Sequence, residues 1–494
     1  MNMTRRDFVG CMAMGAVSLG TARYVQGAAS DFGPDDLKLG ILSDTHVSLE
    51  PGAKGSVTAQ RLRKALEWFR DQHVDGVLVS GDLTNTGLQD EFELFAGVWN
   101  SVFPNGKLPD GSPVANLCHY GDHDAEVRFY RKDVLGARYA KAGLPLPASL
   151  AEGELRKTLW EKYFHEEWSP IVHKRVRGYD FVLAHFLREC PGTTQGLDEF
   201  MKKLNPDPSQ PFFYSQHRWI KGTYMADDGM WGVDSGKNGP ALARYPNVLA
   251  FCGHTHYMLM DERNLWQDGY TVLGTGSLLN QCVARLRENG TEIPWYSDEK
   301  EPTRFTQMQK VNGGQAHAGM LMHLRGNQFV VERRDMERGL PLGPDLLFSI
   351  SAEVLASRMY TNAARTARSV APEFPEGATV AVAKRKGKNR RRETVDQIVI
   401  TFPVAHSTAT TPRAYDYVVT AETQEGGCWR VLRDKRVYSP KVNCPESVDV
   451  GPVACVFAMD ELQGVPVNKV RFKIQPMNSW RVGGKVLCYT GRIS

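Results

Sequence analysis

The sequence has no long apolar run beyond its N-terminus, which excludes a multi-span membrane protein, since a spanning helix needs about 20 apolar residues. It also has no large charge of either sign. Its 60 basic and 56 acidic residues leave a net charge of +4, which favours neither nucleic acid nor an anionic membrane as a partner. No CxxC pair occurs among the nine cysteines, and we assign no disulfide bridge. The composition is that of a soluble globular protein, and 494 residues predict two or more domains.

The N-terminus has the layout of a signal peptide. Arg5 and Arg6 precede the apolar stretch VGCMAMGAVSLG, and the small residues Gly27, Ala28 and Ala29 follow. The arginine pair resembles the twin-arginine export signal, a pathway that carries proteins already folded and loaded with cofactor. An uncleaved anchor is the alternative, but twelve apolar residues are short for a bilayer. We therefore expect residues 1–29 to be removed and the mature protein to be exported, either to the periplasm or out of the cell.

Two regions of different character follow the signal. From residue 36 to about 340, short apolar runs alternate with helix-patterned or loop segments, as in βαβ units. Residues 341–375 are rich in Pro, Gly and Ala, and we expect them to form a linker. Residues 376–494 contain strand-like runs such as TVDQIVITF and KVRFKIQP without helical pattern between them. The sequence thus predicts a layered α/β domain, a linker and a small β-sandwich-like domain.

A concentrated basic run lies near the start of the second region. Seven of the nine residues from Lys384 to Arg392 are Lys or Arg. A polyanion-binding segment and a solvated hairpin tip between two strands both explain such a run, and the hairpin tip is the simpler interpretation.

Polar residues of metal-ligand type follow several predicted strands of the first region. The strands are DLKLGILSD, DGVLVSGDLT, PVANLCHYG, PFFYSQH and NVLAFCGH, and the residues are Asp44, His46, Asp82, Asp122, His123, Asp124, His217, His254 and His256. In open α/β sheets the carboxyl ends of the strands form the edge where sites are built, so we expect these side chains to lie together. One D-x-H or H-x-H at a strand end is more often a polar turn, whereas five such strand ends in a fixed order indicate a site.

This order of motifs, D-x-H, G-D, G-[N]-H-[DE], a lone His and G-H-x-H, resembles the calcineurin-like metallophosphoesterase superfamily. The resemblance covers about residues 37–335, and the C-terminal region is loosely similar to sandwich domains of some exported bacterial members. It implies an α/β fold, a double-layered β-sandwich flanked by helices, with a dinuclear metal centre. Transferred position by position, it places one metal on Asp44, His46 and His256 and the other on Asp122, His217 and His254, with Asp82 bridging both.

The resemblance also implies the chemistry. Carboxylate and imidazole ligands suit divalent Mn, Fe or Zn, and two such ions can clamp a phosphoryl group while a metal-bound hydroxide attacks it. His123 is then a general acid for the leaving oxygen rather than a ligand. Asp124 is placed to orient His123, and an equally good interpretation is an Asx-type helix cap. The expected substrate is a small phosphate ester, with monoester and diester both open, and no nucleic-acid-binding module is evident.

Asp122 stands where the family pattern has Asn. The additional negative charge favours either a diester monoanion as substrate or a trivalent iron, Fe(III), at one of the two metal positions. The alternative to an enzyme is an exported, non-catalytic binding protein whose degraded metal centre only supports the fold. Since the ligand set is intact apart from this substitution, we favour the enzyme, a metal-dependent phosphatase or phosphodiesterase.

Overall fold

The computed structural model of the protein describes residues 23–25, 33, 36–49, 56–126, 133–134, 136–137, 140–141, 143, 150–187, 194–223, 232–281, 316–358, 361–388, 393–406 and 413–489. The predicted signal peptide lies outside these ranges except for Arg23–Val25 (β1), which pairs antiparallel with Asp345–Ser349 (β14). Within the described ranges, no helix has both the length and the apolar character that crossing a bilayer requires.

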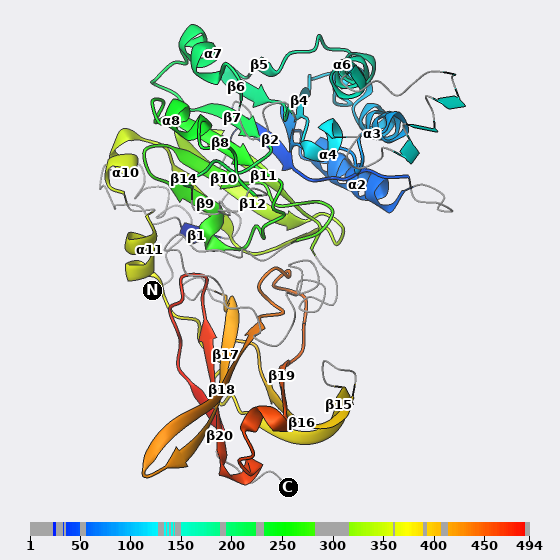
Figure 1. Ribbon diagram of the computed structural model, residues 1–494. Helices are drawn as coiled ribbons and strands as arrows, with labels where there is room; N and C mark the ends of the chain where they lie inside the picture. Colours follow the sequence, from blue (N-terminus) through cyan, green and yellow to red (C-terminus); the bar gives the residue numbers. More distant parts are fainter. Residues whose placement is uncertain are drawn as a thin grey trace.

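Two β-sheets form the centre of the first domain (Figure 1). The first sheet contains, in spatial order, β1, β14, β12 (Gln328–Asp335), β11 (Ala318–Arg325), β2 (Leu37–Leu42), β3 (Gly76–Ser80) and β4 (Ala115–His119), with β13 (Leu340–Pro341) beside β12. The second contains β5 (Ile171–Val176), β6 (Tyr179–Ala184), β7 (Phe212–Gln216), β8 (Val248–Cys252), β10 (Thr271–Gly274) and β9 (Leu265–Gln267). Strands β2, β3 and β4 run parallel, as do β6, β7 and β8, so each sheet gathers several carboxyl ends at one edge.

Alternation along the strands separates the inner and outer faces of each sheet. Leu39 and Ile41 of β2 pack with Phe213 and Phe251 of the second sheet, in the core between the two sheets. Leu42 belongs instead to the cluster on the outer face of the first sheet. Because successive side chains of a strand point to opposite faces, one apolar strand contributes side chains both to the core between the sheets and to the core under the helices. The predicted double-layered β-sandwich flanked by helices is confirmed.

Helices cover the outer faces of both sheets (Figure 1). On the first sheet, Leu62, Leu66 and Phe69 form the buried stripe of one helix, at the spacing of an amphipathic helix. The Ser56 hydroxyl caps this helix by accepting a hydrogen bond from the Ala59 amide. The helices are α2 (Val57–Asp71), α3 (Gln89–Val102), α4 (Asp122–Ala125) and α6 (Leu150–Phe164) near the first sheet, and α7 (Leu197–Leu204) and α8 (Asn238–Leu242) near the second. Short 3-10 turns occur at Pro104–Gly106, Glu262–Asn264, Met459–Leu462 and Val467–Lys469.

The C-terminal region is an all-β domain, as the sequence predicts. Strand β14 lies within the predicted linker but completes the first sheet, and α10 (Ala352–Ala356) and α11 (Asn362–Arg368) follow it. One sheet contains β15 (Ala381–Lys388), β16 (Thr394–Phe402) and β19 (Val453–Ala458). The other contains β18 (Cys428–Tyr438), β17 (Asp416–Glu425), β20 (Val470–Met477) and β21 (Leu487–Tyr489). Side chains of both sheets, including Ile398 and Phe472, form its core.

The two domains meet beside the segment that follows β8. Met258, two residues after His256, is fully buried and packs with Tyr415, Tyr438 and Val442 of the C-terminal domain. The C-terminal domain therefore contacts the loop that carries the G-H-x-H motif.

Candidate metal centre

The carboxyl ends of five strands bring the predicted ligands together at one edge of the sandwich. Asp44 and His46 follow β2, Asp82 follows β3 and Asp122 follows β4, all from the first sheet. The second sheet contributes the histidines that follow β7 and β8, namely His217, His254 and His256. Their ligand atoms form groups in which every member lies within 4.8 Å of the others, one of Asp44, His46 and His256 and another of Asp82, Asp122, His217 and His254.

The first group lies around one oxygen of Asp44. Oδ1 of Asp44 is 3.1 Å from Nε2 of His256 and 3.9 Å from Nε2 of His46. The two histidine Nε2 atoms are 3.3 Å apart, so three ligand atoms converge on one point. The second oxygen of Asp44 is held by the Ser43 hydroxyl at 2.5 Å and the His254 amide at 3.0 Å. One oxygen is thus anchored while the other faces the group.

The second group lies around Nε2 of His217. This nitrogen is 3.1 Å from Oδ1 of Asp122 and 3.1 Å from Oδ2 of Asp82, while Nδ1 of His254 is 3.3 Å from Asp122 Oδ1. Oδ2 of Asp82 also lies 3.5 Å from Nε2 of His46, which belongs to the first group. Asp82 therefore occupies the position between the two groups that a bridging carboxylate requires.

Most of these residues adopt a backbone conformation that side chains other than glycine rarely adopt. The φ angles are positive for Asp44 (50°), His46 (43°), Asp82 (51°), His254 (68°) and His256 (54°). Left-handed conformations of this kind cost about 1–3 kcal/mol each and cluster at functional sites. The sharp turns direct side chains from the strand ends toward a common centre. This arrangement therefore lowers the stability of the folded state by the cost of the left-handed backbone conformations.

Three glycines allow the ligand-bearing turns to pack against each other. A Cβ atom at Gly121 would lie 2.2 Å from Oδ1 of Asp82, and one at Gly253 would lie 2.0 Å from Oγ of Ser43. Gly81 has a φ of +83°, and a Cβ there would lie 2.3 Å from Nδ1 of His217. The glycine before each motif is therefore required by close approach to a neighbouring turn, in addition to the turn geometry expected from sequence.

Burial and charge make this cluster suitable for a bound cation. Asp44, Asp82 and Asp122 are at most 4% exposed, and buried carboxylates are stable only when paired or bound to a metal. Burial raises the pKa of Asp122, but the charges of His254 and His217 outweigh it and hold this pKa well below its usual value. Burial lowers the pKa of His217, whereas Asp82 and Asp122 raise it well above its usual value. The anionic carboxylates thus attract positive charge, which divalent ions bound to these donors would supply.

Contacts behind the ligands fix the orientation of the imidazoles. The Ser80 carbonyl lies 2.9 Å from Nδ1 of His217, which leaves Nε2 directed at the two carboxylates. Oδ1 of Asn280 lies 2.6 Å from Nδ1 of His256 in the same manner. Supporting partners of this kind set the tautomer of a metal-binding histidine. Sequence reasoning missed both residues, since Asn280 follows β10 and belongs to no ligand motif.

His123 lies at the rim of the centre, half-buried, with its ring 4.5 Å from that of His46 at an edge-on angle. One of its nitrogens groups with ligand atoms of His46 and Asp82. Its Nδ1 lies 2.6 Å from the Asn85 carbonyl, so a backbone oxygen orients the ring. Burial lowers the pKa of His123, but Asp82 and Asp122 outweigh it and raise this pKa above its usual value.

The carboxylate of Asp124 is engaged with backbone amides. It accepts hydrogen bonds from the amides of Gly121, Leu83 and Thr84 at 2.8–3.0 Å and from the Thr84 hydroxyl at 2.7 Å. The Gly121 bond is the capping-box contact of α4, in which Asp124 at the third helical position accepts from the amide of the N-cap residue Gly121. The Asx-type cap considered for Asp124 would instead have placed it at the N-cap. The structure thus places Asp124 as a connector between the turns that carry Asp82 and Asp122, and the orienting contact to His123 comes from Asn85 instead.

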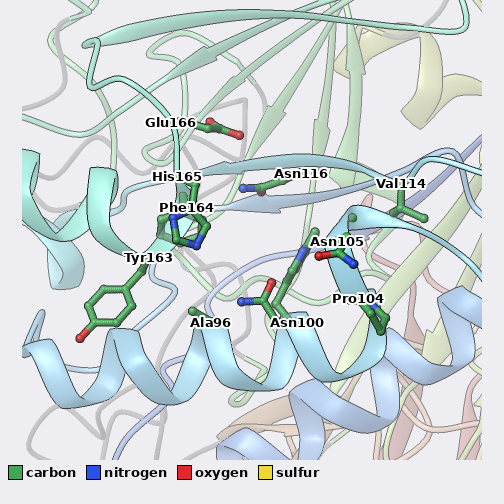
Figure 2. Close-up of a pocket in the computed structure, with 12 residues that line it drawn as sticks. Ala96, Asn100, Pro104, Asn105, Val114, Asn116, Tyr163, Phe164, His165 and Glu166 are labelled. Carbon is green, nitrogen blue, oxygen red and sulfur yellow. The ribbon is translucent and has the colours of Figure 1, made fainter.

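A separate cavity of about 520 Å³ opens at the opposite end of β4 (Figure 2). Asn100 of α3, Asn116 of β4 and Phe164 of α6 line it, together with Asn105. None of the predicted ligands lines it, and Val114 and Asn116 precede the centre of β4 whereas Asp122 follows its end. This cavity is therefore distinct from the metal centre.

A comparison with known protein families finds a match over the part of the chain that contains the candidate metal ligands. Residues 37–258 match the calcineurin-like phosphoesterase family, and this range contains every ligand described above. No curated protein sequence matches the chain. The match confirms the resemblance predicted from the motifs and supports a hydrolase.

Several solved structures are similar to the chain at low identity. A purple acid phosphatase from yellow lupin (Lupinus luteus) seeds is 13% identical with a TM-score of 0.41, over 65% of this chain and 55% of that one. A dimetal phosphatase from Danio rerio is 14% identical with a TM-score of 0.31, over 64% and 99% of the two chains. The anchor protein of the Plasmodium inner membrane complex is 12% identical with a TM-score of 0.35, over 67% and 94%.

Proposed function

Because residues 37–258 match the calcineurin-like phosphoesterase family, we propose that the protein hydrolyses a small phosphate ester with two bound metal ions. One observation carries the proposal: two groups of buried Asp and His side chains lie next to each other, with Asp82 between them. The donor set is complete for two ions, and its carboxylate and imidazole chemistry fits Mn, Fe or Zn. One ion would be held by Asp44, His46, His256 and Asp82, and the other by Asp82, Asp122, His217 and His254.

Two bound metal ions would supply Lewis acidity at the phosphoryl oxygens and would lower the pKa of a water molecule. The protein's own part is to hold and orient these donors and to manage the proton of the leaving group. In hydrolysis, a water molecule gives up one proton to solvent and its oxygen forms a bond to phosphorus, the bond from phosphorus to the ester oxygen breaks, and the ester oxygen takes up a proton.

His123 is the residue that we assign as the source of this proton. The Asn85 carbonyl accepts from Nδ1, so Nε2 is the nitrogen that remains to donate a proton to the ester oxygen. After transfer, the ring keeps the proton on Nδ1, still bonded to Asn85.

The charge of Asp122 supports a phosphodiester as the preferred substrate. A diester is a monoanion, whereas a monoester is largely a dianion at neutral pH. Asp122 adds a negative charge where the family pattern has a neutral Asn, and this reduces the attraction of the centre for a dianion. Its Oδ1 lies against two histidines of the second group, so the charge is placed at the centre itself.

Metal analysis combined with a panel of chromogenic monoesters and diesters tests the proposal. We expect about two equivalents of metal, loss of activity on chelation, and recovery on adding Mn, Fe or Zn. His217→Ala, purified in parallel, controls for contaminating phosphatase and should be inactive. Activity that persists in the chelated protein or in His217→Ala would rule the proposal out. Two bound metals with no activity on any ester would favour the non-catalytic alternative.

A further inference from the structure

The positive charge of the chain is concentrated in one β-ribbon of the C-terminal domain. Residues 381–402, which span β15 and β16, contain seven basic and two acidic residues, a local net charge of +5. The whole chain has a net charge of only +4, so the remaining residues together carry −1. The weak overall charge therefore hides a strongly basic segment of sequence. The structure describes four of its seven basic residues, all of them in β15, and we call the pair of strands β15 and β16 the basic ribbon.

The basic ribbon presents its charges to solvent. In the described part of the chain, β15 pairs with β16 alone and forms the edge of its sheet. Lys384, Arg385, Lys386 and Lys388 are all exposed. These four residues lie in the strand itself, whereas the other three basic residues of the run fall between the two paired strands, outside the described residues. Figure 1 shows β15 at the outer side of the C-terminal domain. Because strand side chains alternate, the charges point to both faces of the ribbon.

Local partners neutralise little of this charge. Lys386 pairs with Asp396 at 2.7 Å, but the two side chains are 71% and 61% exposed, and such ion pairs contribute little in water. Arg385 and Lys388 contact the uncharged side chains of Gln397 and Thr394. Among the described residues, Lys384 has no ion-pair partner. Natural sheets use lysines to protect an edge strand, yet a cluster this dense exceeds that need.

We propose that the basic ribbon binds an anionic lipid surface. Adsorption of basic residues to such a surface needs no shaped groove, which suits charges on both faces of a thin ribbon. The only aromatic side chain in the sequence 381–402 is Phe402, which is buried, so the ribbon offers no exposed aromatic ring on which a nucleic-acid base can stack. The proposal does not rest on the phosphoesterase activity, since no predicted metal ligand lies in this domain.

Vesicle co-sedimentation of the full-length protein tests this inference. We expect binding to vesicles of phosphatidylcholine with phosphatidylglycerol, weak binding to pure phosphatidylcholine, and release by about 0.5 M NaCl through screening. The combined variant Lys384→Gln, Arg385→Gln and Lys386→Gln should bind roughly 100-fold more weakly, at about fivefold for each basic residue. The matched control is Lys64→Gln, Lys157→Gln and Lys203→Gln, which removes the same charge from exposed positions of the first domain and should bind like the wild type.

The outcomes separate this proposal from its alternatives. Equal losses in the two variants, or a wild type that does not distinguish the two kinds of vesicle, would overturn it. Tighter binding to duplex DNA than to anionic vesicles at equal salt would show that the ribbon binds nucleic acid instead. Thermal melting confirms that both variants fold, and turnover of a soluble ester should be unchanged in both.

Discussion

Asn280 fixes the imidazole of His256, because its Oδ1 lies 2.6 Å from Nδ1 of the ring. An amide oxygen only accepts hydrogen bonds, so this contact places the proton on Nδ1. Nε2 is then left with its lone pair facing Asp44, 3.1 Å away. The contact therefore prepares His256 as a ligand of the first group before any metal arrives.

Replacing Asn280 tests this support. Asn280→Ala should weaken metal binding at the first group by about 10–100-fold, because His256 loses the partner that sets its tautomer and orientation. The second group, which contains no contact to Asn280 among the described residues, should keep its affinity. Competition with a graded series of chelators measures both sites. Asn280→Asp retains an acceptor oxygen and is the matched control.

Replacing His123 should reduce turnover alone, whereas replacing His254 should also reduce the metal content. His123→Ala should keep both metals and lose roughly 100- to 10,000-fold in turnover of esters with poor leaving groups, because these need a proton on the departing oxygen. Esters with good leaving groups should be affected much less. His254→Ala should lose metal as well, since its Nδ1 belongs to the second group. Equal losses of both kinds of ester in His123→Ala would remove the general-acid assignment.

The fold was largely predictable where sequence patterns are local. The buried parallel strands read as short apolar runs that end in a ligand motif, and β2, β3, β4, β7 and β8 all lie where those runs predict. Strand β14 was missed because it joins the first sheet from within a segment whose composition suggested a linker. Strand β15 was missed within the basic run because charged, exposed strands lack the apolar alternation by which strands are recognised.

The sequence predicted which residues form the set of metal ligands. It did not predict which residues contact these ligands from behind and orient them. Motif order identified the residues that converge, because each follows a strand. The partners behind them, such as Ser80 and Asn280, depend on which turns pack together in space. Asp124 shows the same limit: its place beside His123 in sequence suggested an orienting role, whereas the fold brings the backbone of Leu83 and Thr84 to it.

His185 should make the folded state sensitive to acid. Its ring is buried against Trp160 and Trp168, Nδ1 accepts a hydrogen bond from the Tyr120 amide at 3.0 Å, and burial holds its pKa well below the usual value. The folded protein thus keeps the ring neutral, while the unfolded chain takes up a proton below about pH 6.5. The free energy of unfolding should fall as the pH drops below 6.5, by up to about 1.4 kcal/mol per pH unit from this group.

Urea unfolding of the wild type and His185→Asn between pH 7 and 5 measures this effect. The variant keeps an acceptor for the Tyr120 amide but cannot titrate. The slope of its free energy of unfolding against pH should therefore be shallower than that of the wild type, by the contribution of up to one proton. Other titrating groups are common to both proteins and cancel in the difference. Identical slopes would show that His185 does not carry the acid sensitivity.

Export is predicted from the N-terminal arginine pair. We propose that the mature protein begins near Ala28 or Ser30 outside the cytoplasm, so cleavage would also remove β1 from the edge of the first sheet. Arg5→Lys combined with Arg6→Lys should retain the chain in the cytoplasm, because the twin-arginine pathway reads the arginines themselves. Cell fractionation and N-terminal sequencing check this. A cytoplasmic, uncleaved product from the unaltered gene would contradict it.

Asp122 sets the net charge of the centre. Two divalent ions carry +4, and Asp44, Asp82 and Asp122 carry −3, which leaves +1 where the family's Asn would leave +2. Oδ1 of Asp122 lies 3.1 Å from Nε2 of His217 and 3.3 Å from Nδ1 of His254, so it is positioned as a donor of the second group. An asparagine keeps an oxygen of the same reach at this point and removes only the charge.

Asp122→Asn should therefore stay folded and metal-loaded while its activity ratio shifts toward monoesters. The additional positive charge binds a monoester dianion more strongly than a diester monoanion, and 1.4 kcal/mol of differential binding corresponds to about tenfold. Metal content and both activities are measured in the wild type and the variant, with Asp122→Ala as the control that removes the donor. If the wild type held one metal or none and the variant bound two, Asp122 would impair metal binding at the centre instead of only changing its net charge.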